Sequence, residues 1–129
     1  MQTETSTTVL IVDDHEIVRK SLVMLISRQE GLVVAGEAGS AAEAVAKAKE
    51  LSPDVVVLDI RLPDGSGVEA CRDILADNPD IKGLMLTSYS DEEAVMGSIM
   101  AGASGYLLKE IRSQEIVDAI KKLDRGSLS

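Results

Sequence analysis

Two short apolar runs, each followed by aspartate, constrain the fold of this chain most strongly. The first run covers residues 9–12 and is followed by Asp13 and Asp14, and the second covers residues 55–58 and is followed by Asp59. Continuous runs of this length, rich in β-branched residues, are typical of strands buried in a parallel sheet. Ligands bind at the carboxyl ends of such strands, where the strand order reverses. If the two strands are neighbours, three carboxylates meet at one end of the sheet.

Three acids in one place favour a bound cation. Like charges a few ångströms apart raise one another's pKa unless a positive charge lies among them. Carboxylate oxygens are the usual ligands of hard divalent cations, and a strand-end cleft suits Mg²⁺ in particular. The sequence therefore predicts a magnesium site formed by Asp13, Asp14 and Asp59.

Apolar runs alternate with helical patterns along the rest of the chain. Further strands are expected from residue 32, at 84–86 and at 105–108, and this alternation indicates βαβ units with helices on both faces of a parallel sheet. We therefore expect an α/β fold of the flavodoxin-like (βα)5 type, doubly wound, with strand order 2-1-3-4-5. That order places the first and third strands side by side. The five helices are expected to begin near residues 15, 40, 66, 91 and 113.

Capping patterns mark the start of two of these helices. Ser40 has Glu43 three positions on, and Ser66 has Glu69, which is the capping-box spacing. Residues 62–67 precede the second pattern and read Leu-Pro-Asp-Gly-Ser-Gly, which predicts a loop.

Composition restricts the class of protein. The 129 residues suffice for one domain, expected at 8–124, with a frayed N-terminus at 1–7 and a possible linker start at 125–129. The net charge of −9 argues against nucleic acid or an anionic membrane as a partner of this chain itself. The single Cys71 excludes an internal disulfide and falls on the apolar stripe of a helix, so we expect it in the core. No apolar run approaches a membrane span, and we expect a cytoplasmic protein.

The expected strand ends carry further polar residues. Thr87 follows the fourth strand and Lys109 follows the fifth, so the cleft would hold three carboxylates, a hydroxyl and an ammonium group. This set suits acceptance of a phosphoryl group by Asp59, because a carboxylate can act as the nucleophile. Mg²⁺ and the lysine would neutralise the phosphoryl oxygens, which is most of what such a transfer needs.

Four segments resemble the receiver domain of two-component response regulators. They are residues 12–15, 58–65, 86–89 and 101–109, and the similarity extends from about residue 8 to 124. The chain looks most like the class in which the receiver precedes a LuxR-type helix-turn-helix domain. All four motifs in order, at the ends of the expected strands, make the resemblance specific.

The resemblance implies roles for the acidic residues and their neighbour. Asp59 matches the phosphoacceptor. Asp14, Asp59 and the backbone carbonyl of Arg61 match the direct Mg²⁺ ligands, and Asp13 matches a residue that acts mainly through water. A sensor histidine kinase is the implied phosphodonor.

The resemblance also implies a switch. Thr87 matches the switch hydroxyl, Lys109 the lysine that contacts the phosphoryl group, and Tyr106 the aromatic residue that changes rotamer. Glu110 departs from the family pattern, in which many receivers have a proline there, often in cis. A cis bond before a residue other than proline costs about 3–4 kcal/mol, so we expect a trans bond or a locally mobile loop at this position.

The sequence leaves two interpretations open for the roles of several side chains. Tyr106 either moves on activation or stays in one rotamer. Arg61 and Tyr89 are either solvated surface side chains or obstacles to the water that would hydrolyse an acyl phosphate. His15 begins a helix and is the only histidine, so we do not expect it to bind a metal.

The fourth helix contains a glycine within its expected length. Gly97 costs a helix about 1 kcal/mol relative to alanine. The glycine either weakens an element that phosphorylation biases or permits close packing.

Partners follow from the resemblance. We expect phosphorylation to promote a homodimer and to control a DNA-binding domain that this chain does not contain. The dimer would form through the fourth helix, fifth strand and fifth helix, or through the first and last helices, where Ile17 and Met24 fall off the main apolar stripe.

Two rival functions remain at this level. A phosphohydrolase of the haloacid dehalogenase pattern needs an acid two residues after the nucleophile, and Arg61 occupies that position. A receiver-like module that works by protein contact alone would not need the acid set.

Overall fold

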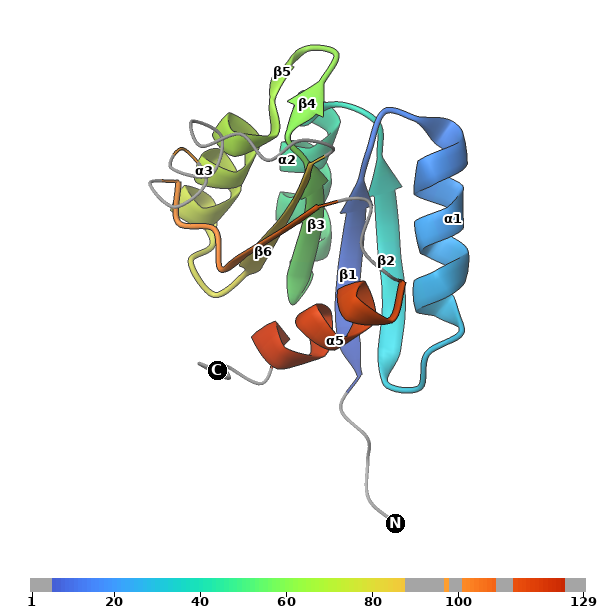
Figure 1. The fold of residues 1–129 in the computed structure, drawn as a ribbon. Helices are drawn as coiled ribbons and strands as arrows, with labels where there is room; N and C mark the ends of the chain where they lie inside the picture. The colour runs from blue at the N-terminus through green and yellow to red at the C-terminus, as the bar shows by residue number, and fades with distance from the viewer. Residues whose placement is uncertain (1–5, 88–96, 98–100, 109–112, 125–129) are drawn as a thin grey trace.

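Five parallel strands form one sheet in the part of the chain that the structure, a computed structural model, describes (Figure 1). The described residues are 6–87, 97, 101–108 and 113–124. The strand order is β2-β1-β3-β6-β7, which confirms the predicted flavodoxin-like order. The strands are β1 (Thr7–Val12), β2 (Leu32–Ala38), β3 (Val55–Asp59), β6 (Lys82–Thr87) and β7 (Gly105–Leu108).

The two faces of the sheet carry separate cores. In β1, Val9 and Ile11 belong to one core and Leu10 and Val12 to the other, because successive side chains of a strand point to opposite faces. Both faces are covered, and the strand therefore reads as a continuous apolar run instead of an alternating one.

One face is covered by α1 (Glu16–Ser27) and α5 (Ser113–Asp124). Leu22 of α1 and Ile116 and Ile120 of α5 are buried in the same cluster, on the apolar faces that the sequence predicts for these helices.

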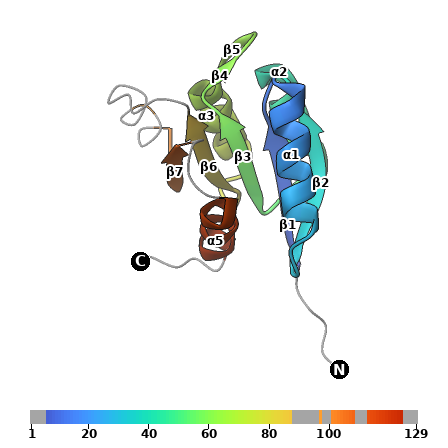
Figure 2. The same ribbon diagram turned by 45° about the vertical axis from the view of Figure 1, so that its right-hand side comes forward.

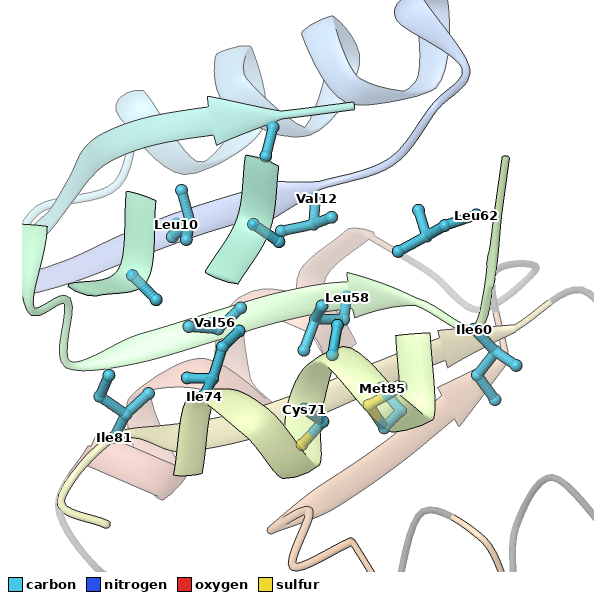
Figure 3. Packing of buried hydrophobic residues seen from close by; sticks show 14 residues of the cluster. Leu10, Val12, Val56, Leu58, Ile60, Leu62, Cys71, Ile74, Ile81 and Met85 are labelled. Carbon is cyan, nitrogen blue, oxygen red and sulfur yellow. The ribbon is translucent and has the colours of Figure 1, made fainter. Parts of the chain in front are cut away.

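The other face is covered by α2 (Ala41–Leu51) and α3 (Gly67–Asp77). Figure 3 shows Cys71 and Ile74 of α3 within this core, which also contains Leu58 of β3. Burial raises the pKa of the Cys71 thiol to about 11, so this residue stays protonated and serves the core as predicted.

The outer face of α1 carries two exposed apolar side chains. Ile17 is 82% exposed and Met24 is 55% exposed. Because they are seven residues apart, they lie on the same side of the helix. Both are directed away from the core, as the sequence indicates.

The first strand begins earlier than predicted. Thr7, which we expected in a frayed terminus, is buried in β1, and its N–H donates to the Gly31 carbonyl at 2.8 Å. The prediction was wrong at this residue because a polar threonine suits a strand once a partner strand is present. Residues 1–5 and 125–129 lie outside the described residues.

A short antiparallel arm replaces the loop expected after Asp59. β4 (Arg61–Leu62) pairs with β5 (Gly65–Ser66), and the arm projects beyond the end of β3 in both views (Figures 1 and 2). Leu62 anchors the arm, because its side chain is buried in the core under α2 and α3.

Most of the helix expected near residues 91–101 lies outside the described residues. Across the described part of the chain, no helix has the length and apolar character that crossing a membrane requires.

Candidate functional site

The ends of β1 and β3 bring three acids together. The two strands are paired with Val12 opposite Leu58, so the residues that follow them lie at the same level. One side-chain ligand atom from each of Asp13, Asp14 and Asp59 lies within 4.8 Å of the others. The predicted convergence of the three carboxylates is confirmed.

Main-chain bonds orient the two buried acids. Asp13 is 1% exposed and Asp59 is 5% exposed. The Oδ1 atom of Asp13 accepts a hydrogen bond from the N–H of His15 at 2.9 Å, and the Oδ1 atom of Asp59 accepts one from the N–H of Arg61 at 3.2 Å. Each is a side-chain bond to the main chain two residues on, which fixes the direction of the carboxylate.

His15 contributes more to the site than the sequence indicated. Its Nδ1 atom lies 3.2 Å from an oxygen of Asp13 and 3.2 Å from an oxygen of Asp14. The histidine is also the N-cap residue of α1, as expected. Its position directly after the acid pair was the sequence signal for these contacts, since the side chain of an N-cap residue stays close to the residues that precede it.

The donor set fits a hard divalent cation. Three acids offer carboxylate oxygens at one strand-end edge, two of them buried, and an imidazole nitrogen lies among them. Oxygen donors of this kind are the ligands that Mg²⁺ prefers.

The arm brings the main chain of Arg61 beside Asp59. The N–H of Ile60 donates to the Leu86 carbonyl at 3.1 Å, and the N–H of Gly67 donates to the Ile60 carbonyl at 2.7 Å. With the bond from Arg61 to Asp59, these contacts tie the segment after the acid to both β6 and α3. The Arg61 side chain is exposed.

Asp64, at the tip of the arm, binds the start of α2. Its Oδ1 accepts the N–H of Ala41 at 2.7 Å and its Oδ2 accepts the N–H of Ala42 at 3.0 Å. These two main-chain bonds hold the pKa of the Asp64 carboxyl below its usual range. Two of the N–H groups that a helix start leaves without helical partners are thus satisfied from the arm.

The remaining predicted residues are only partly described. Thr87 is the last residue of β6, where its main chain pairs with Leu108 of β7. Lys109, Glu110 and Tyr89 lie outside the described residues.

Tyr106 lies in β7 opposite Met85 of β6. Its half-buried side chain packs against the core that lies under α2 and α3. Its position is therefore compatible with either of the two interpretations, a moving or a fixed ring.

The fold and the acid cluster define a doubly wound α/β domain with carboxylates at the point where the strand order reverses. Residues 9–121 match the response regulator receiver domain, and the chain belongs to this family.

Curated relatives are DNA-binding or response-regulator proteins. The chain is 52% identical over 118 residues to the DNA-binding transcriptional activator DevR/DosR of Mycobacterium tuberculosis, covering 92% of this chain and 54% of that protein. It is 44% identical over 118 residues to the response regulator protein VraR of Staphylococcus aureus, covering 92% of this chain and 56% of that protein. The chain thus spans about half the length of these relatives.

Solved structures agree on the fold. A LuxR-family two-component response regulator from an Aurantimonas species superposes with a TM-score of 0.90 at 36% identity, covering 95% of this chain and 87% of that one. The response regulator domain of Thermotoga maritima CheB gives 0.85 at 30% identity, covering 93% and 97%.

Proposed function

We propose that this receiver domain accepts a phosphoryl group on Asp59 in a Mg²⁺-dependent reaction. The observation that carries the proposal is the convergence of Asp13, Asp14 and Asp59 within 4.8 Å at the ends of two neighbouring strands. Asp14, Asp59 and the backbone carbonyl of Arg61 would hold the ion directly, and Asp13 would act through water.

The reaction transfers a phosphoryl group from a donor to the Asp59 carboxylate. An Asp59 carboxylate oxygen attacks phosphorus, the bond from phosphorus to the donor breaks, and the donor leaves with the electron pair. A cation held by the acids would reduce the repulsion between the carboxylate and the incoming phosphoryl oxygens. Lys109 would pair with one of these oxygens, and the Thr87 hydroxyl would donate to another once the phosphoryl group is present.

Main-chain bonds prepare Asp59 for this role. Its Oδ1 is held by the N–H of Arg61, so the carboxylate needs little reorientation before attack.

The domain catalyses only its own phosphorylation and dephosphorylation. The side chains of Arg61 and Tyr89 would slow dephosphorylation by obstructing the water that hydrolyses the acyl phosphate.

The proposed partners are a sensor histidine kinase as phosphodonor, a second copy of this chain and an attached DNA-binding domain. DevR/DosR is described as a DNA-binding transcriptional activator, and the chain covers about half of it. In that arrangement the phosphorylated receiver would dimerise and so bring two DNA-binding domains together.

Intact mass after incubation with Mg²⁺ and a small acyl phosphate tests the proposal. We expect one added phosphoryl group on the wild type and on Asp73→Asn, an exposed acid of α3, and none on Asp59→Asn or after chelation of Mg²⁺. Sedimentation of the same samples measures whether phosphorylation promotes the dimer. No mass gain on the wild type would overturn the proposal in favour of a phosphate-independent binding module.

A further inference from the structure

Arg19 lies behind the acid pair and binds its main chain. The Nη1 atom of Arg19 donates to the backbone carbonyl of Asp13 at 2.9 Å. The Nε atom of the same guanidinium donates to Oε1 of Glu37 at 3.0 Å. The side chain is 18% exposed, so these bonds are largely shielded from water. Arg19 therefore links α1 and β2 to the residue that begins the acid cluster.

Glu37 is a well-fixed anchor for this arginine. Lys20 contacts the Glu37 carboxylate at 3.1 Å, and the Nζ atom of Lys47 donates to the Glu37 carbonyl at 2.6 Å. Burial alone would raise the pKa of Glu37. The hydrogen bonds from Lys20 and Arg19 outweigh this effect and hold the pKa below its usual range. The anchor is therefore ionised at neutral pH and is tied to α1 and α2.

The bond from Arg19 completes the restraint of Asp13. The N–H of Asp13 donates to the Ala38 carbonyl at 3.1 Å, and its Oδ1 accepts the N–H of His15. The main chain of Asp13 is thus held by β2 on its amino side and by Arg19 on its carbonyl side. The same peptide unit leads directly into Asp14, so its orientation sets where the Asp14 carboxylate lies.

We propose that Arg19 is a positioning residue for the divalent cation: by holding the Asp13 carbonyl, it keeps the acid pair in the arrangement that binds the ion. This inference rests on the proposed function, since it assumes that the acids bind Mg²⁺. Outer groups that orient metal ligands commonly change metal affinity by tenfold or more.

A general charge effect would act in the opposite direction. A guanidinium bound to the main chain of Asp13 lowers the negative potential around the acids and so weakens their attraction for a metal cation. If charge alone mattered, removing Arg19 would strengthen Mg²⁺ binding. Positioning predicts that removal weakens it, and the sign of the change separates the two explanations.

Lys20 offers a matched control. It carries the same charge, is the next residue of α1 and pairs with the same carboxylate of Glu37, and its described hydrogen bond goes to that carboxylate and not to Asp13. The Lys20 side chain is 54% exposed, so its ion pair with Glu37 contributes little, and without it Glu37 still binds Arg19 and Lys47. Lys20→Gln therefore removes one positive charge and leaves the bond from Arg19 to Asp13 in place.

The test is calorimetric titration of the metal-free protein with Mg²⁺, in parallel with urea unfolding. We expect Arg19→Gln to raise the Kd for Mg²⁺ about tenfold, Lys20→Gln to leave it unchanged or lower it, and Arg19→Lys to fall between wild type and Arg19→Gln. Arg19→Lys replaces two donor nitrogens by one, so it cannot reproduce the separate bonds of Nε to Glu37 and of Nη1 to the Asp13 carbonyl. This variant provides the readout if Arg19→Gln does not fold.

The titration distinguishes failure of the proposed function from failure of the inference about Arg19. A wild type that binds no Mg²⁺ would overturn the proposed function and this inference together. A wild type that binds, with Arg19 variants that bind equally well or better, would overturn the inference alone. A lower urea midpoint without a change in Kd would assign Arg19 a purely structural role, which also contradicts it.

Discussion

Gly67 lies where the chain passes from the arm into α3, directly against the main-chain carbonyl of Asp59. A Cβ atom at this position would overlap that carbonyl oxygen and crowd Ile60. The N–H of Gly67 also donates to the Ile60 carbonyl. Its lack of a side chain is therefore what lets the arm close against the acid.

Substitution of Gly67 tests this close approach. We expect Gly67→Ala to lower the free energy of unfolding by roughly 1–3 kcal/mol, the usual range for overpacking, and to weaken Mg²⁺ binding because Asp59 must shift. Urea unfolding and Mg²⁺ titration measure the two effects.

Gly97→Ala is the control for this substitution. Among the described residues, its added methyl would meet Val68 Cγ1 at 3.5 Å, an ordinary contact. We expect a gain of up to about 1 kcal/mol, because alanine is the better helix former. A Gly67→Ala protein as stable as the wild type would contradict the argument.

The positions of Asp13, Asp14 and Asp59 could be predicted from the sequence because each acid directly follows an apolar strand. The contact of His15 was within reach of the same reasoning, because this residue directly follows the acid pair. The contact of Arg19 with the Asp13 carbonyl was not, since it depends on where a long side chain ends after the helix has formed. Sequence spacing specifies backbone positions better than the ends of long side chains.

Among the secondary-structure elements, the helix starts show that local spacing predicts a cap but not every hydrogen bond within it. Ser40 accepts the N–H of Glu43 at 3.1 Å, as a capping box predicts, but the Glu43 carboxylate binds the N–H of Gly39 instead of that of Ser40. Ser66 accepts the N–H of Val68. The capping serines were predictable from local spacing, but the N–H groups that the Glu43 carboxylate and the Ser66 hydroxyl bind were not.

The arm was missed for a related reason. Each of its strands has two residues, too few for any periodicity in the sequence. Its contact with α2 through Asp64 joins segments more than 20 residues apart, which no local pattern encodes.

Loss of the Asp64 contact would loosen the arm from α2. We expect Asp64→Asn to lower the urea midpoint at neutral pH, because the amide has one acceptor oxygen in place of two and its NH2 group cannot accept the second N–H. The neutral amide also interacts less favourably than a carboxylate with the start of a helix. Asp73→Asn, which removes a charge from α3, serves as the control.

The pH dependence of this effect has a defined sign. The folded-state pKa of Asp64 is lowered, so its contribution is fully present above the pKa of the unfolded chain, about 4, and is lost as the pH falls through the lower folded value. The difference in stability between wild type and Asp64→Asn should therefore shrink at acid pH. A difference that is constant from pH 7 to pH 3 would exclude the carboxylate as its source.

At the scale of the whole molecule, the order of the strands could be predicted because right-handed crossovers leave few arrangements for five βα units. The parallel pairing of β1 with both β2 and β3 follows from that order. The roles of Thr87, Lys109 and Tyr106 stay predictions.

Binding of Mg²⁺ should stabilise the entire domain, since the site needs two strands and the arm in their folded positions. At a Mg²⁺ concentration of 100 times Kd, we expect a gain of about 2.7 kcal/mol in the free energy of unfolding. Urea unfolding with and without Mg²⁺ measures this gain.

Asp14→Asn supplies the comparison. Without metal it should be at least as stable as the wild type, because one of three like charges is gone. It should gain little from Mg²⁺. Equal gains for both proteins would place the ion elsewhere.

Strand order also dictates when the site is made during translation. β1 lies between β2, which follows it closely in the chain, and β3, which is synthesised much later. A ribosome that has released only the first 50 residues has supplied Asp13 and Asp14 but neither Asp59 nor the strand that carries it. The acid cluster is therefore completed late in synthesis, and a truncated nascent chain presents Asp13 and Asp14 without Asp59.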